Sequence, residues 1–265
     1  TSLTVLRLAD LVAEAGIPAG VINIITGNGH TAGDRMVKHP DVDKVAFTGS
    51  TEIGKLINRN ATDTLKRVTL ELGGKSPVVV MPDVDVAEAA PGAAGAIFFN
   101  AGQVCVAGSR LYAHRSIFDQ VLEGVAATAP FWAPRPSLDP DAHMGALVSK
   151  EQHDRVLGYI EAGKRDGASV VMGGDAPSSD GGYFVNPTVL VDVNPQMSVV
   201  REEIFGPVVV AQRFDDLDEV AKSANDTCFG LGAGIWTKDV ATMHKLAAKI
   251  KSGTVWGNCH AVIDT

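Results

Sequence analysis

The hydrophobic pattern at the start of the chain alternates between helical and extended periods. Leu8, Leu11 and Val12 belong to an amphipathic helical stretch. The pattern predicts helices near 3–15, 31–38 and 51–60, and strands at 21–25, 44–48 and 67–71. Short strands separated by helices are typical of βαβ units, which form a parallel sheet with right-handed crossovers. This part is therefore predicted to be α/β, as one half of a doubly wound domain.

A second alternating series begins after Gly73-Gly74, and we take this glycine pair as the domain boundary. Asp83 is expected to cap an alanine-rich helix, and Ser149 and Gln152 have the spacing of a capping box. The expected strands are 76–81, 110–114, 170–172, 188–191, 208–213, 231–237 and 254–256, and the expected helices are 83–99, 117–128, 149–166, 215–225 and 238–250.

The composition indicates a globular protein with a small-molecule ligand. Of the 265 residues, 45% are hydrophobic and 20% are charged, which is enough apolar material for a sizeable core. A net charge of −8 and a pI near 5.3, without clustered Lys and Arg, argue against a nucleic-acid partner. The longest apolar stretches, such as 93–99, are too short to span a bilayer. We therefore expect no membrane association and a cytoplasmic location.

The three cysteines have to be interpreted one at a time. Their odd number and their spacing indicate neither a disulfide framework nor a zinc site, so no metal is expected. Cys105 lies between an apolar helix and a strand, in the stretch GQVCVAGSR at 102–110. The glycines permit backbone N–H groups to approach a ligand, as an oxyanion formed beside a thiol requires. A buried packing role is the other interpretation of a lone thiol.

A carboxylate stands at the end of one predicted parallel strand. Glu71 closes the run VTLE at 68–71. Ligands of open α/β sheets bind beyond the carboxyl ends of the strands, so this side chain is aimed at a crevice and suits a general base. A solvated glutamate at a strand end is the alternative.

Two strand-to-helix turns in the first part suit a phosphate. Gly49-Ser50 follows the strand at 44–48, and the segment 27–33, with Gly29, follows the strand at 21–25. A helix N-terminus offers free N–H groups and the positive end of its dipole to an anion. Ordinary helix capping explains the same pattern. Because the turns end neighbouring predicted strands, we expect one dinucleotide to lie across both.

Two carboxylates precede an aromatic residue and a Gly-Pro turn in REEIFGP at 201–207. A carboxylate at this turn suits the hydroxyls of a ribose, while Phe205 suits a flat ring. A charged surface turn is the alternative interpretation.

Taken together, these stretches resemble the aldehyde dehydrogenase superfamily over essentially the whole chain. The matching stretches are LELGGKSP at 70–77, FFNAGQVCVAGSR at 98–110, EEIFGPV at 202–208 and, less specifically, VAFTGSTEIG at 45–54. The resemblance implies part of a Rossmann-type cofactor domain at 1–73 and an α/β catalytic domain at 74–265. It also implies an internal fragment without N-terminal and C-terminal parts, and a homodimer or homotetramer for the intact protein.

The resemblance also implies a role for single residues. Cys105 attacks a small-molecule aldehyde, and Glu71 is the general base. Glu203 binds the nicotinamide ribose, Phe205 abuts the nicotinamide, and Leu72 offers a backbone contact to the carboxamide. The expected contacts with the pyrophosphate and adenine side of the cofactor are Gly29, Gly49, Ser50 and Gly54. The expected substrate contacts are Phe99, Val104, Val106 and Ile263.

Some residues of the family pattern do not occur in this sequence. The oxyanion asparagine of the family belongs to an earlier Pro-Trp-Asn motif, and Asn100 is a different asparagine. In the family, the residues that bind the adenine ribose also precede the position of Thr1, so this sequence does not distinguish NAD from NADP. The resemblance implies NAD as the cofactor, with NADP as the alternative. The end of the chain, at 258–264, is similar to relatives that act on aliphatic or aryl-acetaldehyde substrates, phenylacetaldehyde among them.

Our working hypothesis is a covalent oxidation in which the Cys105 thiolate adds to the aldehyde, hydride passes to the nicotinamide, and Glu71 activates water against the thioester. Three alternatives stay open at this point. The thioester could pass to CoA, although a general base for water argues against that. The thiol could belong to a cysteine hydrolase, although no histidine stands in a motif that would pair with it. The chain could also be an NAD-binding protein without activity.

Overall fold

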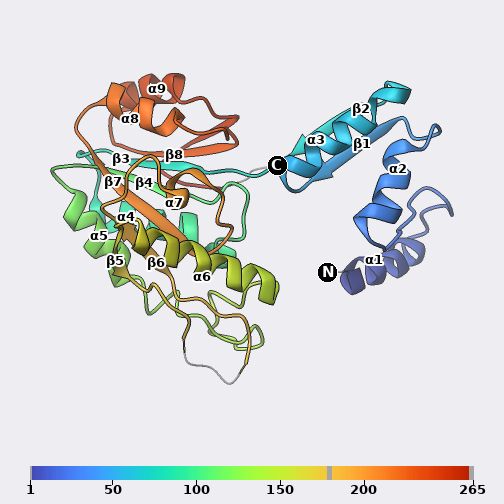
Figure 1. Ribbon diagram of the computed structural model, residues 1–265, viewed down its shortest axis with the longest axis horizontal. Coiled ribbons are helices and arrows are strands. Elements are labelled where there is room, and N and C mark those ends of the chain that lie inside the picture. The colour runs from blue at the N-terminus through green and yellow to red at the C-terminus, as the bar shows by residue number, and fades with distance from the viewer. Residues whose placement is uncertain (1, 178–180, 263–265) are drawn as a thin grey trace. The chain divides into compact units, whose positions relative to one another are not determined.

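The chain folds as two units, Thr1–Leu72 and Gly73–Thr265, in a computed structural model that describes residues 2–177 and 181–262 (Figure 1). Both units are α/β, as predicted, and each has its own hydrophobic core. The division falls at the first glycine of Gly73-Gly74. The functions expected for 1–73 and 74–265 stay predictions.

A two-stranded parallel sheet forms the centre of the first unit. β1 (Lys44–Thr48) pairs with β2 (Arg67–Glu71), and exposure alternates along both strands. The half-buried side chains of the two strands pack against Val37, Ile57 and Ala61; they are Val45, Phe47, Val68 and Leu70. The helical segments of this unit are α1 (Ser2–Glu14), the π-helical turn η1 (Gly29–Gly33), α2 (Asp34–Lys38), α3 (Thr51–Asn60) and the 3-10 turn η2 (Thr62–Thr64).

The strand predicted at 21–25 is wrong. The residues there form bends and irregular chain, and Val21 and Ile25 are 66% and 65% exposed. A strand needs a neighbour for its backbone hydrogen bonds, and β1 pairs only with β2 within the described residues. The apolar run has the composition of a strand, but no neighbouring strand within the described residues pairs with it.

A seven-stranded sheet forms the centre of the second unit, in the order β5-β6-β7-β4-β3-β8-β9. All neighbours are parallel except β5 and β6, which are antiparallel. The strands are β3 (Pro77–Val80), β4 (Arg110–His114), β5 (Ser169–Met172), β6 (Thr188–Val191), β7 (Val208–Phe214), β8 (Gly232–Trp236) and β9 (Thr254–Gly257). They confirm the predicted strands of this part to within two residues at each end.

Helices cover both faces of this sheet (Figure 1). Val78 and Val80 of β3 pack in the core with α4 and α5, whereas Val79 packs with α8 and α9 on the opposite face. Each of these fully buried valines contributes about 1.5–3 kcal/mol. The helical segments are α4 (Val86–Phe98), η3 (Phe99–Gly102), α5 (Phe118–Ala127), α6 (Lys150–Arg165), α7 (Ser198–Arg201), α8 (Leu217–Asn225) and α9 (Val240–Lys249). Within 2–177 and 181–262, no helix has the length and apolar character needed to cross a lipid bilayer.

The predicted cap of α4 is wrong by two residues. Asp85 is the N-cap and accepts a hydrogen bond from the Ala87 N–H at 2.9 Å. Asp83 instead accepts hydrogen bonds from the Thr237 hydroxyl and the Lys238 N–H at the end of β8. Both aspartates stand just before the apolar pattern, so local spacing alone favoured neither of them.

Candidate active site

Three loops of the second unit lie at the amino ends of adjacent strands of its sheet. They are 73–76 before β3, 102–109 before β4 and 202–207 before β7. Because β7, β4 and β3 are adjacent and parallel, their amino ends lie side by side. This order brings the Cys105 loop and the Glu203 turn together, although they are far apart in the sequence.

The link Gly73-Gly74 runs between these two segments. A Cβ atom on Gly74 would lie 2.2 Å from the carbonyl oxygen of Cys105, and one on Gly73 would lie 2.1 Å from Oε2 of Glu203. The Gly74 N–H also donates a hydrogen bond of 3.1 Å to Oε1 of Glu203. Only glycine fits at position 74, because the backbone oxygen of Cys105 occupies the space of any side chain, whereas a side chain at position 73 would have to displace the Glu203 carboxylate.

The loop that carries Cys105 begins with strained backbone. Asn100 and Ala101 have left-handed φ values of 51° and 53°, followed by Gly102 at 68°. A Cβ on Gly102 would lie 2.0 Å from the carbonyl oxygen of Gly206, so the loop is in close contact with the turn before β7. Left-handed backbone at a non-glycine residue costs about 1–3 kcal/mol and is concentrated at functional sites.

The thiol of Cys105 lies in a turn and is half-buried. On one side of it, the Gln103 side chain accepts a hydrogen bond of 2.9 Å from the Val148 N–H. On the other side, the Ala107 N–H donates to the Val104 carbonyl at 3.0 Å. A nucleophilic thiol has to be held in place and still be reachable, and the loop provides both conditions.

Two carboxylates of the turn before β7 have different partners. Glu202 accepts a hydrogen bond of 2.6 Å from the Tyr159 hydroxyl; burial, followed by this bond, raises the pKa of Tyr159 to about 12. Burial also raises the pKa of Glu203, and the Gly74 N–H, Lys75 and Arg155 oppose that rise. The Glu203 carboxylate accepts from the N–H of Gly74, the residue that packs against the Cys105 carbonyl. A ribose ligand in this site would require such a position beside the Cys105 loop.

Helix α6 holds the backbone of the same turn. The Gln152 side chain donates to the carbonyl oxygens of Ile204 at 2.9 Å and Phe205 at 2.8 Å. The Arg155 guanidinium donates to the Glu203 carbonyl at 3.0 Å. These bonds support the left-handed φ of 57° at Phe205.

The contact of α6 with the 202–207 turn was not predicted from the sequence. Gln152 was expected to complete a capping box, but only half of the box forms, because Ser149 accepts from the Gln152 N–H while the amide side chain turns to the 202–207 turn. Gln152 and Arg155 are three residues apart and share one face of the helix, which was the only local signal.

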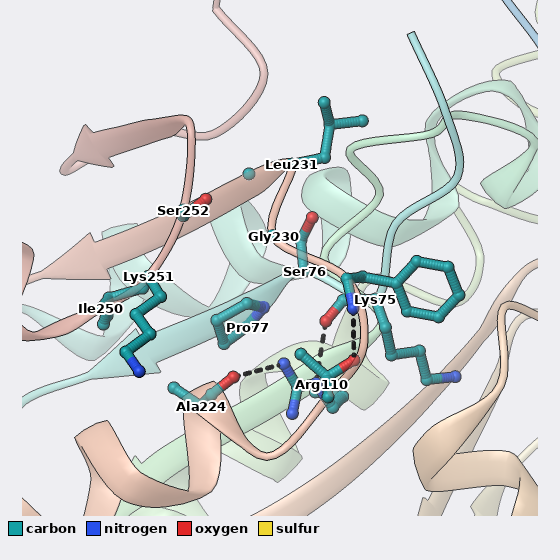
Figure 2. Close-up of a pocket in the computed structure, with 13 residues that line it drawn as sticks. Lys75, Ser76, Pro77, Arg110, Ala224, Gly230, Leu231, Ile250, Lys251 and Ser252 are labelled. Carbon is teal, nitrogen blue, oxygen red and sulfur yellow. Dashed lines mark hydrogen bonds between the residues drawn. The ribbon is translucent and has the colours of Figure 1, made fainter. Parts of the chain in front are cut away.

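Lys75 is 1% exposed, and its amine has no hydrogen-bond partner within the part of the chain that the structure describes. Arg110 binds the Lys75 carbonyl at 2.8 Å and the Ala224 carbonyl at 2.7 Å, and the Lys75 amine points away from this guanidinium (Figure 2). Burial lowers the pKa of Lys75 from 10.5 to about 7; Arg110 adds to the fall, while Glu203 and Glu202 oppose it. Arg110 is thus a structural residue, and Lys75 is a buried amine beside the Glu203 turn.

Lys75→Met is expected to raise the melting temperature at pH 7 by several degrees. A fall of the pKa from 10.5 to about 7 means that the unfolded chain binds more protons between these pH values, at a cost to the folded state of roughly 4 kcal/mol near pH 7. The cost disappears as the pH rises through this window. The gain from Lys75→Met should therefore shrink toward pH 10, as measured by thermal unfolding. Lys251→Met, at an exposed lysine, is the control, and a gain independent of pH would contradict the prediction.

The first unit contains Glu71, the proposed general base, and part of the proposed cofactor site. Glu71 is the last residue of β2, as predicted, and its side chain is exposed. Its carbonyl accepts a hydrogen bond of 3.0 Å from the Gly49 N–H, so the Gly49-Ser50 turn and Glu71 share one edge of the small sheet. The Ser50 hydroxyl accepts from the Ile53 N–H at 3.3 Å and caps α3. Gly54 has no room for a side chain, because its Cβ would lie 2.5 Å from Cδ2 of Leu72.

The other residues expected to contact the cofactor or the substrate lie in different environments. Gly29 does not follow a strand, because the strand at 21–25 does not form, and it begins the π-helical turn η1 instead. Phe99 is 64% exposed, and Val104 and Val106 are half-buried. Ile263 lies outside the described residues. The substrate and cofactor roles of these residues stay predictions.

Comparisons with known proteins agree with this geometry. The model of the aldehyde dehydrogenase family matches residues 1–265. Phenylacetaldehyde dehydrogenase of Pseudomonas fluorescens is 48% identical over 265 residues, with 100% of this chain and 53% of that protein covered. Human aldehyde dehydrogenase 1A1 is 46% identical over 264 residues, covering 99% and 52% of the two chains.

A solved structure of an NAD⁺ complex of a Bacillus cereus aldehyde dehydrogenase is also similar. Its TM-score is 0.96 at 47% identity, covering 100% of this chain and 54% of that one. The chain spans about half the length of the curated relatives that it matches.

Proposed function

The chain belongs to the aldehyde dehydrogenase family, and from this premise we propose that the protein oxidises an aldehyde to a carboxylic acid with NAD as the hydride acceptor. One observation carries the proposal. Gly73-Gly74 packs directly between the Cys105 carbonyl and the Glu203 carboxylate. The residue proposed as the nucleophile and the residue proposed as the ribose ligand therefore contact the same glycine pair. The NAD⁺ complex of the Bacillus cereus relative supports the choice of cofactor, and NADP stays an alternative.

The residues present fit a dinucleotide. The Glu203 carboxylate, held by the Gly74 N–H, suits ribose hydroxyls, and Phe205, which is 38% exposed, suits the nicotinamide ring. The N-terminus of α3, with Gly49, Ser50 and Gly54, suits the pyrophosphate side, and Leu72 offers its backbone to the carboxamide. When bound, NAD accepts the hydride of the substrate.

The chain's own residues divide the reaction into two steps. The Cys105 thiolate forms a bond to the aldehyde carbon while the carbonyl π electrons move to oxygen. The resulting thiohemiacetal alkoxide re-forms the carbonyl as it loses hydride, which leaves a thioester on Cys105. Glu71 then takes a proton from a water molecule, whose oxygen attacks the thioester carbon. The C–S bond breaks, the carboxylic acid leaves, and the thiolate is restored. Sulfur suits both steps because it is a good nucleophile and also a good leaving group.

We propose an aliphatic or aryl-acetaldehyde as the substrate. Val104 and Val106 flank the thiol with apolar side chains, and Phe99 exposes a large apolar surface nearby in the sequence. The similarity to phenylacetaldehyde dehydrogenase supports the same class. A cytoplasmic homodimer or homotetramer belongs to this proposal.

The proposal is tested with the protein expressed from its complete reading frame. We expect phenylacetaldehyde and NAD⁺ to yield NADH and phenylacetic acid in equal amounts, followed by absorbance and by chromatography of the product. Added CoA should change neither the rate nor the product. Formation of an acyl-CoA would favour the CoA-acylating alternative, and ester or amide cleavage without NADH would favour a cysteine hydrolase.

A further inference from the structure

His260 follows β9 in the sequence, but its side chain reaches the Cys105 loop. Its Nε2 lies 2.6 Å from the carbonyl oxygen of Val106, the residue next to Cys105. A carbonyl oxygen can only accept, so Nε2 must carry the hydrogen. The other ring nitrogen, Nδ1, is buried and has no hydrogen-bond partner within the described residues. The bond therefore fixes one tautomer of a neutral ring, and burial keeps the pKa of His260 below its usual value.

Two glycines of β8 create the space for this ring. Gly232 and Gly234 are two residues apart and face the same side of the sheet. A Cβ on Gly234 would lie 2.7 Å from Nδ1 of His260, and one on Gly232 would lie 2.9 Å from the Trp256 ring and 3.3 Å from Cβ of Val106. The Trp256 and His260 ring centroids are 5.0 Å apart. The bare face of β8 thus lets the segment after β9 fold back beneath the nucleophile loop.

The two carbonyl groups that follow the Cys105 side chain are both held. The Cys105 carbonyl packs against Gly74, and the Val106 carbonyl accepts from His260. Beyond them, the Gly108 N–H donates to the Ala96 carbonyl at 2.8 Å. Removing the imidazole donor would leave a half-buried carbonyl unsatisfied. It would also leave the Val106–Ala107 peptide held only by its N–H, which donates to the Val104 carbonyl at 3.0 Å.

We propose that His260 is a positioning residue for the nucleophile: by donating to the Val106 carbonyl it fixes the peptide between Val106 and Ala107, and with it the turn that sets the direction of the Cys105 thiol. The inference rests on the proposed function, because it assigns a purpose to the Cys105 loop. It also links the segment 258–262 to the nucleophile, so changes in that segment alter the reactivity of Cys105 as well as the substrate pocket. Reactions that need a near-attack geometry lose about 100-fold when the reacting atom moves by roughly 1 Å.

The test compares variants that keep or lose the donor, in the protein expressed from its complete reading frame. His260→Phe keeps a flat ring without a donor, and His260→Gln keeps a donor close to the position of Nε2. We expect His260→Phe to lower kcat about 10- to 100-fold, with the KM for NAD⁺ unchanged. His260→Gln should restore the rate to within about threefold of the wild type. His244→Phe, at an exposed histidine of α9, is the matched control.

A second measurement does not depend on catalysis. The alkylation rate of Cys105 by iodoacetamide, resolved by peptide mass spectrometry, is divided by that of the exposed Cys228 in the same molecule. We expect this ratio to change at least about fivefold in His260→Phe and to return in His260→Gln. An unchanged ratio in His260→Phe, or equal changes in both variants, would overturn the positioning role. Because the ratio is measured without aldehyde or NAD⁺, it decides the question even if the proposed oxidation fails.

If His260→Phe does not fold, His260→Asn provides the same comparison with a smaller change. Its shorter amide does not reach the Val106 carbonyl, whereas that of His260→Gln does. The alkylation ratio should then differ between Asn and Gln at similar melting temperatures, and equal ratios would overturn the proposal.

Discussion

Cys105→Ser is expected to lower the rate of NADH formation by at least about 10³-fold in the protein expressed from its complete reading frame. A serine hydroxyl is scarcely ionised near neutral pH, and an alkoxide is a much poorer leaving group than a thiolate. The structure adds a geometric reason: the loop that carries Cys105 follows strained backbone at Asn100 and Ala101, and the Cys105 carbonyl packs against Gly74. Steady-state NADH formation, measured by absorbance, checks the prediction.

The matched control is Cys228→Ser. Cys228 is exposed in the loop before β8, so its replacement should leave the rate within about twofold of the wild type. Binding of NAD⁺ should persist in both variants, because neither thiol belongs to the proposed cofactor contacts. If Cys105→Ser kept more than about a hundredth of the activity, the covalent mechanism would be wrong.

Regular elements could be predicted where the pattern of burial repeats along the chain. β4 and β6 match their predicted bounds because a short apolar run marks each of these buried strands. The strand expected at 21–25 has the same composition but has no neighbouring strand in the structure, and a single-sequence pattern contains no information on pairing. The four-residue helix α7 was missed because one turn is too short to show a helical period.

The candidate site could be predicted where its chemistry lies in contiguous motifs. Cys105 and Glu203 belong to such motifs, and the structure brings their loops together. Gln152 and His260 were not predicted in these roles. Gln152 donates to a backbone carbonyl 53 residues away, and His260 donates to one 154 residues away. A hydrogen bond from a side chain to a distant backbone depends on the tertiary fold alone, since any residue type offers the same carbonyl.

The glycines show a third case, in which the expected role is observed and the structure adds a second one. Gly73-Gly74 was expected to mark a boundary and to follow a strand that presents a carboxylate. In the structure, their missing side chains leave room for oxygen atoms of Cys105 and Glu203. A side chain at position 74 would therefore push the Cys105 loop away, and one at position 73 would displace the Glu203 carboxylate.

Glu71→Gln is expected to leave the first turnover of NADH nearly intact and to slow the following turnovers about 10²- to 10⁴-fold. The amide cannot take a proton from water, so the thioester on Cys105 should accumulate after hydride has left. Glu71 is exposed at the end of β2 and makes no side-chain hydrogen bond within the described residues, so the variant should fold normally. Stopped-flow absorbance separates the burst from the steady state, and mass spectrometry detects the acylated Cys105 peptide.

Hydroxylamine provides the decisive control for this assignment. It cleaves a thioester without the help of a general base. Added to Glu71→Gln after the burst, once free aldehyde has been removed, it should release the acyl group from Cys105 as a hydroxamate. Glu52→Gln, at an exposed carboxylate of α3, should behave as the wild type. Loss of the burst itself would mean that Glu71 also acts before hydride transfer, for example by taking the proton of the thiol. A base limited to deacylation would then be ruled out.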